Sequence, residues 1–389
     1  MRRLSVIIAS AALCGLLIPL APLPAAAASS SSPVVVVIDS TGFDTTNPAL
    51  AGHVVAEVCL DALGGQSWEQ AFCPGHASAV TGAGVAVPQT SGGSYVFPSS
   101  EHGTAVASEV LNVDPSAQLI VIRSLYSFTN ALSWVYQHRG SYNLAAVVYS
   151  MAGPLNDPSV RGWVPCDQAT ESVAGRQIVD KPFIDSLAQA GVPVVIAAGN
   201  DGNAEYLAFP ACVSSAVSVG ASDGSTVASY SNVSTQISVL APGTATVANE
   251  TAPGQFVDGS LSGTSIAAPY VGGVFALARA AFPGTPYQVV LAAMRASGTL
   301  VNDQAVRGLP IVSPSATLAL LAAGSVPSLS STFSTQVLVA PQSSPAAQPA
   351  QQLNAALARD AALQKRVTAL LKQIAALRRR TTAARRAKG

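Results

Sequence analysis

The middle of the chain alternates between short apolar runs and longer stretches with a helical pattern. The apolar runs lie within 32–44, where the run ends at Asp39, and at 117–125, 143–153 and 191–200. Continuous apolar runs of this length are typical of strands that are buried on both faces. Helix-like stretches lie between them at about 104–112, 127–138 and 176–190. This alternation predicts an α/β fold, in which helices flank a doubly wound, mostly parallel sheet.

The pattern continues towards the C-terminus with two short strands and two helices. We expect the strands at 216–221 and 236–243, and the helices from Ser265 to about 282 and over about 286–296. The first of these helices is apolar on nearly every face, with Ala, Val, Phe and Leu dominating. A helix of this kind is predicted to lie in the middle of its domain.

Residues 1–28 have the pattern of a secretory signal peptide, because a basic start precedes an apolar run and a small-residue cleavage site. Three prolines interrupt the run and argue against an uncleaved anchor, and no later span reaches the ~20 apolar residues of a membrane crossing. We therefore expect a secreted, extracellular protein, with attachment to the cell envelope as a further option. About ten residues separate the signal from the strand that ends at Asp39, so folding is expected to need no cleaved N-terminal chaperone domain.

The composition divides the chain into an acidic body and a basic tail. The chain is 49% hydrophobic and 10% charged, which is ample for a large core and unlike a disordered chain. Residues 29–352 hold 8 Lys or Arg and 19 Asp or Glu, which gives a net charge of −11. Residues 353–389 hold 10 Lys or Arg and one Asp, which gives a net charge of +9. Such asymmetry indicates segments with separate roles. We predict a folded domain over 29–324, a Ser/Pro/Ala-rich linker over 325–352, a helix over 353–380 and a flexible basic tail over 381–389.

The predicted C-terminal helix has a heptad-like pattern. Alternating spacings of three and four residues separate Leu353, Ala356, Asp360, Leu363, Val367, Leu370, Ile374 and Leu377, of which only the aspartate is polar. Four heptads are enough for a short coiled coil that brings copies of the chain together. An amphipathic helix that packs on the body or on an anionic surface is an equal alternative. No nucleic-acid partner is expected.

Four cysteines remain once the signal peptide is removed: Cys59, Cys73, Cys166 and Cys212. An even number in an exported chain indicates disulfides, and four cysteines allow three pairings. We favour Cys59 with Cys73, which closes a short loop, and Cys166 with Cys212, which ties a long insertion to the start of a strand. The cysteines lack the CxxC spacing that would predict a metal site. No acidic loop can be assigned to a structural calcium ion. The chemistry described below requires no cofactor.

The stretch Ser-Gly-Thr-Ser that contains Ser265 allows two interpretations. The serine can cap a helix by accepting hydrogen bonds from free backbone N–H groups, or it can be a nucleophile held at a helix start. A nucleophilic hydroxyl needs a base, a group that orients the base, and donors for the oxyanion. His102 lies at the start of a predicted helix, whereas Asp39 and Asn200 end buried strands. Because the carboxyl ends of parallel strands form one edge of a sheet, these residues are candidates for one site.

Four motifs, in this order, resemble the subtilisin-like serine proteases, over roughly residues 33–322. They are VVVVIDSTG, EHGTAVAS, VVIAAGNDG and SGTSIAAPYVGG. Four motifs in the family's Asp, His, Ser order are far more specific than any one of them. The resemblance implies that Asp39 orients His102, that His102 is the general base and then the general acid, and that Ser265 attacks the scissile carbonyl. It implies further that Asn200 and the Ser265 backbone N–H form the oxyanion hole.

The resemblance also implies a substrate-binding segment, formed by Ser150, Met151, Ala152 and Gly153. Such a segment pairs with an extended protein or peptide substrate and forms a wall of the first specificity pocket. The sequence departs from the family pattern at this segment, where Ser-Leu-Gly-Gly is commoner, and at Ala105 and Tyr270, where the family often has histidine. No catalytic group is lost, so the departures concern substrate preference.

The leading hypothesis is a secreted serine endopeptidase that works through an acyl-enzyme. The alternative from another class is a catalytically silent scaffold of the same fold, which binds peptides or a cell-surface partner. A third interpretation is a related acid-active peptidase that uses Glu101 in place of His102. A histidine base predicts a rate that rises through roughly pH 6–7, which distinguishes the two enzymes.

The residue after the candidate nucleophile generates a prediction about oxidation. The family usually has methionine at this position, and a thioether beside a nucleophile is an oxidation target. This chain has Ile266 there. We expect peptidase activity to survive mild peroxide treatment, measured as residual hydrolysis after timed exposure. Rapid inactivation that tracks no other modification would contradict the prediction.

Overall fold

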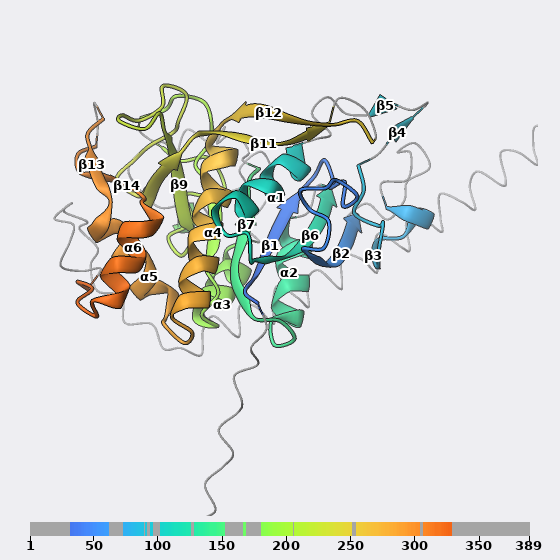
Figure 1. Ribbon diagram of the computed structural model, residues 1–389, viewed down its shortest axis with the longest axis horizontal. Coiled ribbons are helices and arrows are strands. Elements are labelled where there is room, and N and C mark those ends of the chain that lie inside the picture. The colour runs from blue at the N-terminus through green and yellow to red at the C-terminus, as the bar shows by residue number, and fades with distance from the viewer. Residues whose placement is uncertain are drawn as a thin grey trace, which may run out of the picture. The chain divides into compact units, whose positions relative to one another are not determined.

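A computed structural model provides the fold of the chain, and one large sheet organises it (Figure 1). The structure describes residues 32–61, 73–88, 90–91, 94–95, 102–125, 128–151, 166–168, 180–204, 206–250, 254–303 and 306–328. In this part of the chain, ten strands join in the order β13-β14-β10-β9-β8-β7-β1-β6-β2-β3. The strand pairs are parallel except for β2 with β3 and β13 with β14, which are antiparallel. The sheet is therefore mostly parallel, as predicted.

The strands of the sheet are short, and most of the central ones are fully buried. Their bounds are β1 Val34–Asp39, β2 Val54–Asp61, β3 Ala79–Thr81, β6 Gln118–Leu125, β7 Leu144–Tyr149, β8 Val194–Ala197, β9 Val217–Ser222, β10 Val239–Pro242, β13 Thr299–Val301 and β14 Leu309–Ile311. The four apolar runs of the middle of the chain became β1, β6, β7 and β8. The run at 143–153 was expected to extend further, but its strand ends at Tyr149.

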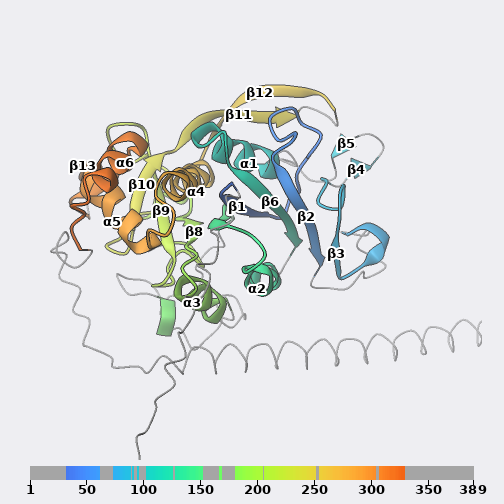
Figure 2. The same cartoon turned by 60° about the horizontal axis from the view of Figure 1, so that its bottom comes forward.

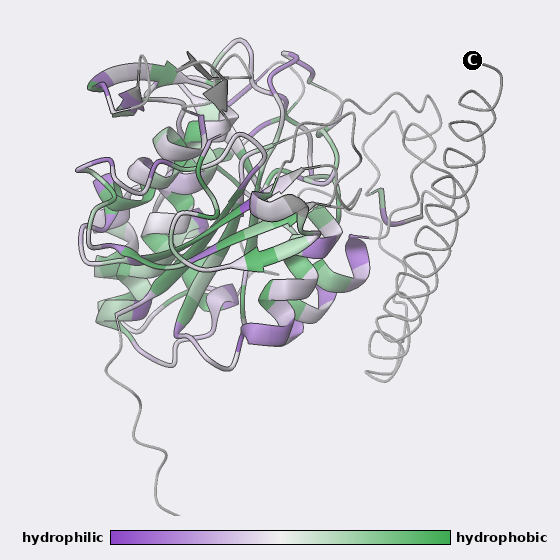
Figure 3. Cartoon of the chain, turned by 90° about the vertical axis from the view of Figure 1, so that its right-hand side faces the viewer, coloured by the Kyte–Doolittle hydropathy of each residue, from purple (hydrophilic) through white to green (hydrophobic). Residues whose placement is uncertain are grey.

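Helices cover both faces of the sheet. α1 (His102–Val113) and α4 (Thr264–Ala281) lie on one face, and α2 (Phe128–His138) and α3 (Lys181–Gln189) lie on the other (Figure 2). The alternation of side chains along β1 explains the two cores, because Val35 and Val37 pack with α1 and α4 while Val36 and Ile38 pack with α2 and α3. The strands of the sheet are accordingly mostly apolar, whereas the flanking helices mix apolar and polar residues (Figure 3).

Two further helices complete the core on the α4 side. α5 (Tyr287–Ser297) and α6 (Pro314–Ala322) contribute to the same apolar cluster as α1 and α4. Glycines let α4 approach its neighbours closely. A Cβ at Gly272 would lie 2.5 Å from Val148 Cγ2 on β7, and one at Gly273 would lie 2.6 Å from Val113 Cβ on α1. The small residues that follow Ser265 therefore serve helix packing against the sheet and against α1.

The strand order places the end of β1 at a switch point of the sheet. β1 lies between β6 and β7 in the sheet, so the chain crosses over β1 when it passes from β6 to β7. Such points leave a crevice at the carboxyl ends of the strands, where α/β proteins bind their ligands. Asp39 is the last residue of β1 and is fully buried there.

A hairpin that the sequence analysis did not predict leads into α4. It consists of β11 (Thr244–Glu250) and β12 (Phe256–Ser262), which are antiparallel and lie beside α1 (Figure 1). Ser108 Oγ accepts a hydrogen bond from Ala248 N at 2.9 Å, and Asn112 Nδ2 donates to Thr246 O at 2.9 Å. The hairpin is thus fixed to α1 immediately before the chain enters α4.

Smaller elements complete the described fold: β4 Thr90–Ser91, β5 Ser94–Tyr95 and the 3₁₀ helices η1 Pro74–His76 and η3 Cys166–Gln168. The predicted signal peptide, the linker beyond residue 328 and the helix and tail over 353–389 lie outside the described residues. Among the residues that are described, no helix combines the length and hydrophobicity that crossing a bilayer requires.

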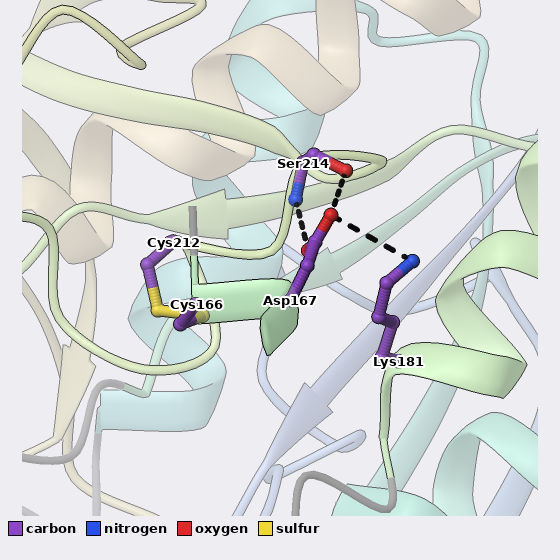
Figure 4. Close-up of a disulfide and its surroundings, with 5 residues drawn as sticks. All are labelled: Cys166, Asp167, Lys181, Cys212 and Ser214. Atoms are coloured by element: carbon purple, nitrogen blue, oxygen red, sulfur yellow. Dashed lines mark hydrogen bonds and ion pairs between the residues drawn. A yellow bond between two sulfur atoms is a disulfide. The ribbon is translucent and has the colours of Figure 1, made fainter. Parts of the chain in front are cut away.

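Two disulfides join the pairs that the sequence analysis favours, Cys59 with Cys73 and Cys166 with Cys212. Polar contacts surround the second one (Figure 4). Asp167 accepts hydrogen bonds from Ser214 N at 3.0 Å and from Ser214 Oγ at 2.5 Å, and Lys181 Nζ lies 3.9 Å from its carboxylate. This disulfide and its neighbours therefore join η3 to the segment before β9 and to the start of α3.

The two disulfides should contribute unequally to stability. They close loops of 14 and 46 residues, and loop entropy then gives about 3 and about 4 kcal/mol of stabilisation respectively. We expect Cys166→Ser with Cys212→Ser to lower the free energy of unfolding more than Cys59→Ser with Cys73→Ser. Denaturant unfolding of the two variants beside the parent chain measures this. An equal or reversed order would contradict the loop-entropy argument.

Candidate active site

Asp39 is a buried carboxylate whose two oxygens are both hydrogen-bonded. Oδ1 accepts from Thr41 N at 2.8 Å and from Thr41 Oγ1 at 2.7 Å, and Oδ2 lies 2.7 Å from His102 Nδ1. Burial by itself would raise the pKa of Asp39, but the attraction of His102 and these hydrogen bonds together lower the pKa below its usual value. Asp39 is therefore an ionised group that is held in one orientation.

His102 is the first residue of α1, and its ring is fixed by Asp39. Because an ionised carboxylate only accepts hydrogen bonds, Nδ1 carries a proton and Nε2 is left as the basic nitrogen of the neutral ring. Thr41 also fixes the start of α1, since its Oγ1 accepts from Gly103 N at 2.9 Å. Only glycine fits at this position, because a Cβ on Gly103 would lie 2.1 Å from Gly42 O.

Ser265 is the second residue of α4 and is partly exposed. The N-cap position belongs to Gly263, so Ser265 does not have the capping role that was one of its two interpretations. Pro269 has no N–H to donate to the Ser265 carbonyl one turn earlier. Ser150 Oγ donates to that carbonyl instead, at 3.0 Å. The predicted substrate-binding segment is therefore joined to the backbone of the candidate nucleophile.

Asn200 follows β8 and is exposed, and its side-chain amide has a defined orientation. Its Oδ1 accepts from Thr264 N and from Thr264 Oγ1, both at 2.9 Å. A backbone N–H can only donate, so this contact identifies Oδ1 and leaves Nδ2 on the other side of the amide. A Cβ built on Gly263 would lie 3.3 Å from Asn200 Nδ2 and 3.4 Å from Ser265 Oγ. Both polar groups therefore border the same position on the backbone.

The four predicted catalytic residues form two groups at one edge of the sheet. Asp39 and His102 are in direct contact, and Asn200 and Ser265 both border Gly263. The helices that carry His102 and Ser265 pack against each other on the same face of the sheet (Figures 1 and 2). Both helices begin beside the carboxyl end of a strand, which is where the sequence analysis expected the site.

The remaining predicted site residues are described only in part. Met151 is partly exposed, and its Sδ lies 4.0 Å from Ser40 Oγ, next to Asp39. Ala152 and Gly153 lie outside the described residues. Thr41 and Thr264 were not among the predicted site residues, although each lies within two residues of a predicted catalytic residue. Hydroxyl residues so close to a polar site are a usable signal, because they bond readily to local groups.

Two other histidines have structural contacts. His53 Nδ1 lies 3.0 Å from Ala117 O, and His138 stacks on Trp134 with 4.0 Å between the ring centroids. Within the part of the chain that the structure describes, no group of three or more His, Cys, Asp or Glu side chains gathers as a metal site requires.

Comparison with known proteins identifies the family. The sequence matches the subtilase family over residues 30–309. Subtilisin DY of Bacillus licheniformis is 30% identical over 234 residues, which cover 55% of this chain and 76% of that protein. Subtilisin NAT of Bacillus subtilis subsp. natto is 32% identical over 199 residues, which cover 46% of this chain and 45% of that protein. The chain therefore belongs to the subtilase family of serine-type endopeptidases.

A solved structure supports the same fold. A protease structure from Pseudoalteromonas arctica aligns with a TM-score of 0.56 at 20% sequence identity. The alignment covers 75% of this chain and 90% of that one. The doubly wound sheet with its flanking helices is thus shared with this protease.

Glu109 is a buried acid on α1, two turns after His102. Asn112 Nδ2 donates to its Oε2 at 2.8 Å, and Tyr270 of α4 is near enough for the charge of Glu109 to raise the tyrosine pKa further, after the larger effect of burial. Burial raises the pKa of Glu109 from 4.5 to about 7, against the smaller lowering effect of the Asn112 hydrogen bond. The folded state therefore binds a proton here more tightly than the unfolded state does.

This pKa predicts how stability depends on pH. A carboxyl whose pKa is raised by folding destabilises the fold as pH rises from about 4.5 to about 7, and the loss is complete above that range. We expect Glu109→Gln to raise the free energy of unfolding at pH 8 by roughly 2 to 3 kcal/mol. Below about pH 4.5 the variant and the parent chain should unfold at the same denaturant concentration. A difference that does not change with pH would contradict the assignment.

Proposed function

We propose that the chain is an exported serine endopeptidase in which Asp39, His102 and Ser265 form the catalytic triad. The observation that carries the proposal is the 2.7 Å contact between His102 Nδ1 and the buried carboxylate of Asp39. This contact fixes the ring with Nε2 as its base, which is the state that general-base catalysis needs. A role limited to peptide binding gives no reason to bury an ionised carboxylate against a histidine at the carboxyl edge of the sheet.

The reaction begins with proton transfer from Ser265 Oγ to His102 Nε2 as the oxygen attacks the scissile carbonyl carbon. The carbonyl π electrons move to oxygen and form an oxyanion, and the positive imidazolium is stabilised by Asp39. His102 then gives the proton to the leaving amine, the C–N bond breaks and an acyl-enzyme remains. Water attacks the ester through the same two proton transfers and releases the acid.

Asn200 Nδ2 and the Ser265 backbone N–H are the proposed oxyanion donors. Support comes from the orientation of the Asn200 amide, because Thr264 engages Oδ1 and leaves Nδ2 near Gly263, the residue that Ser265 Oγ also borders. Donors that are fixed before reaction stabilise the developing charge without further reorganisation. The segment that starts at Ser150 and Met151 is the proposed contact for an extended peptide substrate.

Export is proposed from the sequence of residues 1–28 and from cysteine use. Disulfides persist in oxidising compartments outside the cytosol, and the four cysteines beyond the signal peptide form two disulfides. The alternative is a silent scaffold that binds peptides in the same crevice, and it differs from the enzyme in one property. A scaffold has no activated serine.

A serine-directed fluorophosphonate tests the triad. The phosphorus reagent reacts only with a serine whose hydroxyl is activated by a base, so we expect one label per chain, located at Ser265 by peptide mass spectrometry. His102→Ala should abolish labelling. His138→Ala is the matched control, because that histidine stacks on Trp134 and is expected to leave labelling unchanged. Folded parent chain that takes no label would favour the scaffold.

A further inference from the structure

Asn232 is a completely buried amide, and its side chain is bonded to the loop that contains Asn200. Its Oδ1 accepts from Asp201 N and from Asn203 N, both at 3.0 Å. Its Nδ2 donates to Asp201 Oδ2 at 3.1 Å. One side chain thus bonds to the backbone of two residues that follow Asn200 and to the side chain of one of them.

The backbone around Asn232 holds the other side of the same loop. Asn232 N donates to Gly199 O at 2.9 Å, and Gly202 N donates to Tyr230 O at 2.7 Å. Gly199 has a positive φ of 105°, and a Cβ there would lie 2.5 Å from Asn232 Nδ2. The loop backbone and the Asn232 amide are therefore in contact at a position where only glycine fits. The residues on both sides of Asn200 are held by one buried group.

Two different contacts control Asn200. Thr264 sets the orientation of its side-chain amide, as described above, whereas its own backbone lies in the loop that Asn232 holds. An oxyanion donor contributes fully only when it is placed within a fraction of an ångström. The backbone position of the donor is therefore linked to a residue more than thirty positions away in the sequence.

We propose that Asn232 is a positioning residue for the oxyanion donor. This inference rests on the proposed function, because it assigns to Asn232 an effect that acts only through Asn200. A buried asparagine with a merely structural role would lower stability and leave turnover unchanged. A positioning residue lowers kcat while KM for a small peptide substrate stays nearly constant, since the donor acts on the transition state.

A double-mutant cycle separates these roles. We expect Asn200→Ala to lower kcat by about 10²- to 10³-fold and Asn232→Ala to lower it on the order of tenfold, with KM changed less than about twofold. In the Asn200→Ala background, Asn232→Ala should lower kcat no further. Ser234→Ala is the matched control, because that side chain is equally buried in the same segment but accepts from Gln236 N, away from the loop. Its kcat should equal that of the parent chain.

A rescue experiment covers the case in which the alanine variant fails to fold. Asn232→Asp keeps the acceptor for the two backbone N–H groups but loses the donor to Asp201 and places two carboxylates together. Adding Asp201→Asn restores that contact with donor and acceptor exchanged. We expect the single variant to lose kcat and the double variant to recover it to within about threefold of the parent chain.

The outcomes distinguish this inference from the proposed function. Failure of the parent chain to take the fluorophosphonate removes the proposed triad, and failure of Asn200→Ala to lower kcat removes the proposed oxyanion donor. Either result removes the inference as well. If those assays succeed, one result overturns the inference alone. In that result, Asn232→Ala lowers kcat by the same factor in the Asn200→Ala background as in the parent chain. Recovery of thermal stability without recovery of kcat in the rescue variant also overturns it.

Discussion

A buried carboxylate at the end of the central strand determines how the candidate site is built. An ionised group of this kind is stable in a protein interior only when hydrogen bonds and an opposite charge replace its hydration. Thr41 and His102 supply these to Asp39, and Thr41 also bonds to the first turn of α1. The compensation of one charge therefore fixes both the ring and the helix that carries it.

The second half of the site depends on close packing of α4. Glycines at the contacts with β7 and α1 let the helix lie at the centre of the domain, and its first turn then reaches the loop after β8. A proline in this helix removes one backbone donor, and a hydroxyl from Ser150 replaces it. The first turn of α4, the segment that starts at Ser150 and the loop after β8 are thus parts of one hydrogen-bonded arrangement.

Much of this could be predicted from the sequence, because buried strands and ordered motifs are local signals. The end of β1 and the starts of α1 and α4 were found from apolar runs and small-residue patterns, whereas β8 ends at Ala197, before the predicted end at Asn200. The β11–β12 hairpin, β2 and α6 were missed. β12 is largely exposed, and β2 carries the buried Glu57 among apolar residues. Neither strand therefore shows the regular pattern of apolar and polar residues that would have predicted it. The contacts of Asn232 had no local signal, because they join residues about thirty positions apart and only the fold brings them together.

The order in which the elements appear along the chain has a consequence for synthesis. β1 is made first, but its neighbours β6 and β7 come roughly eighty to one hundred residues later, and α4 begins only at Thr264. Contacts between such distant segments form late and slowly. A growing polypeptide therefore exposes the valine-rich residues Val34–Ile38 until β6 and β7 have been translated, and the face of that strand that packs on α4 stays uncovered until α4 has been made. During this interval the apolar segment is open to association with other nascent chains, so aggregation during synthesis is the hazard that this chain order creates.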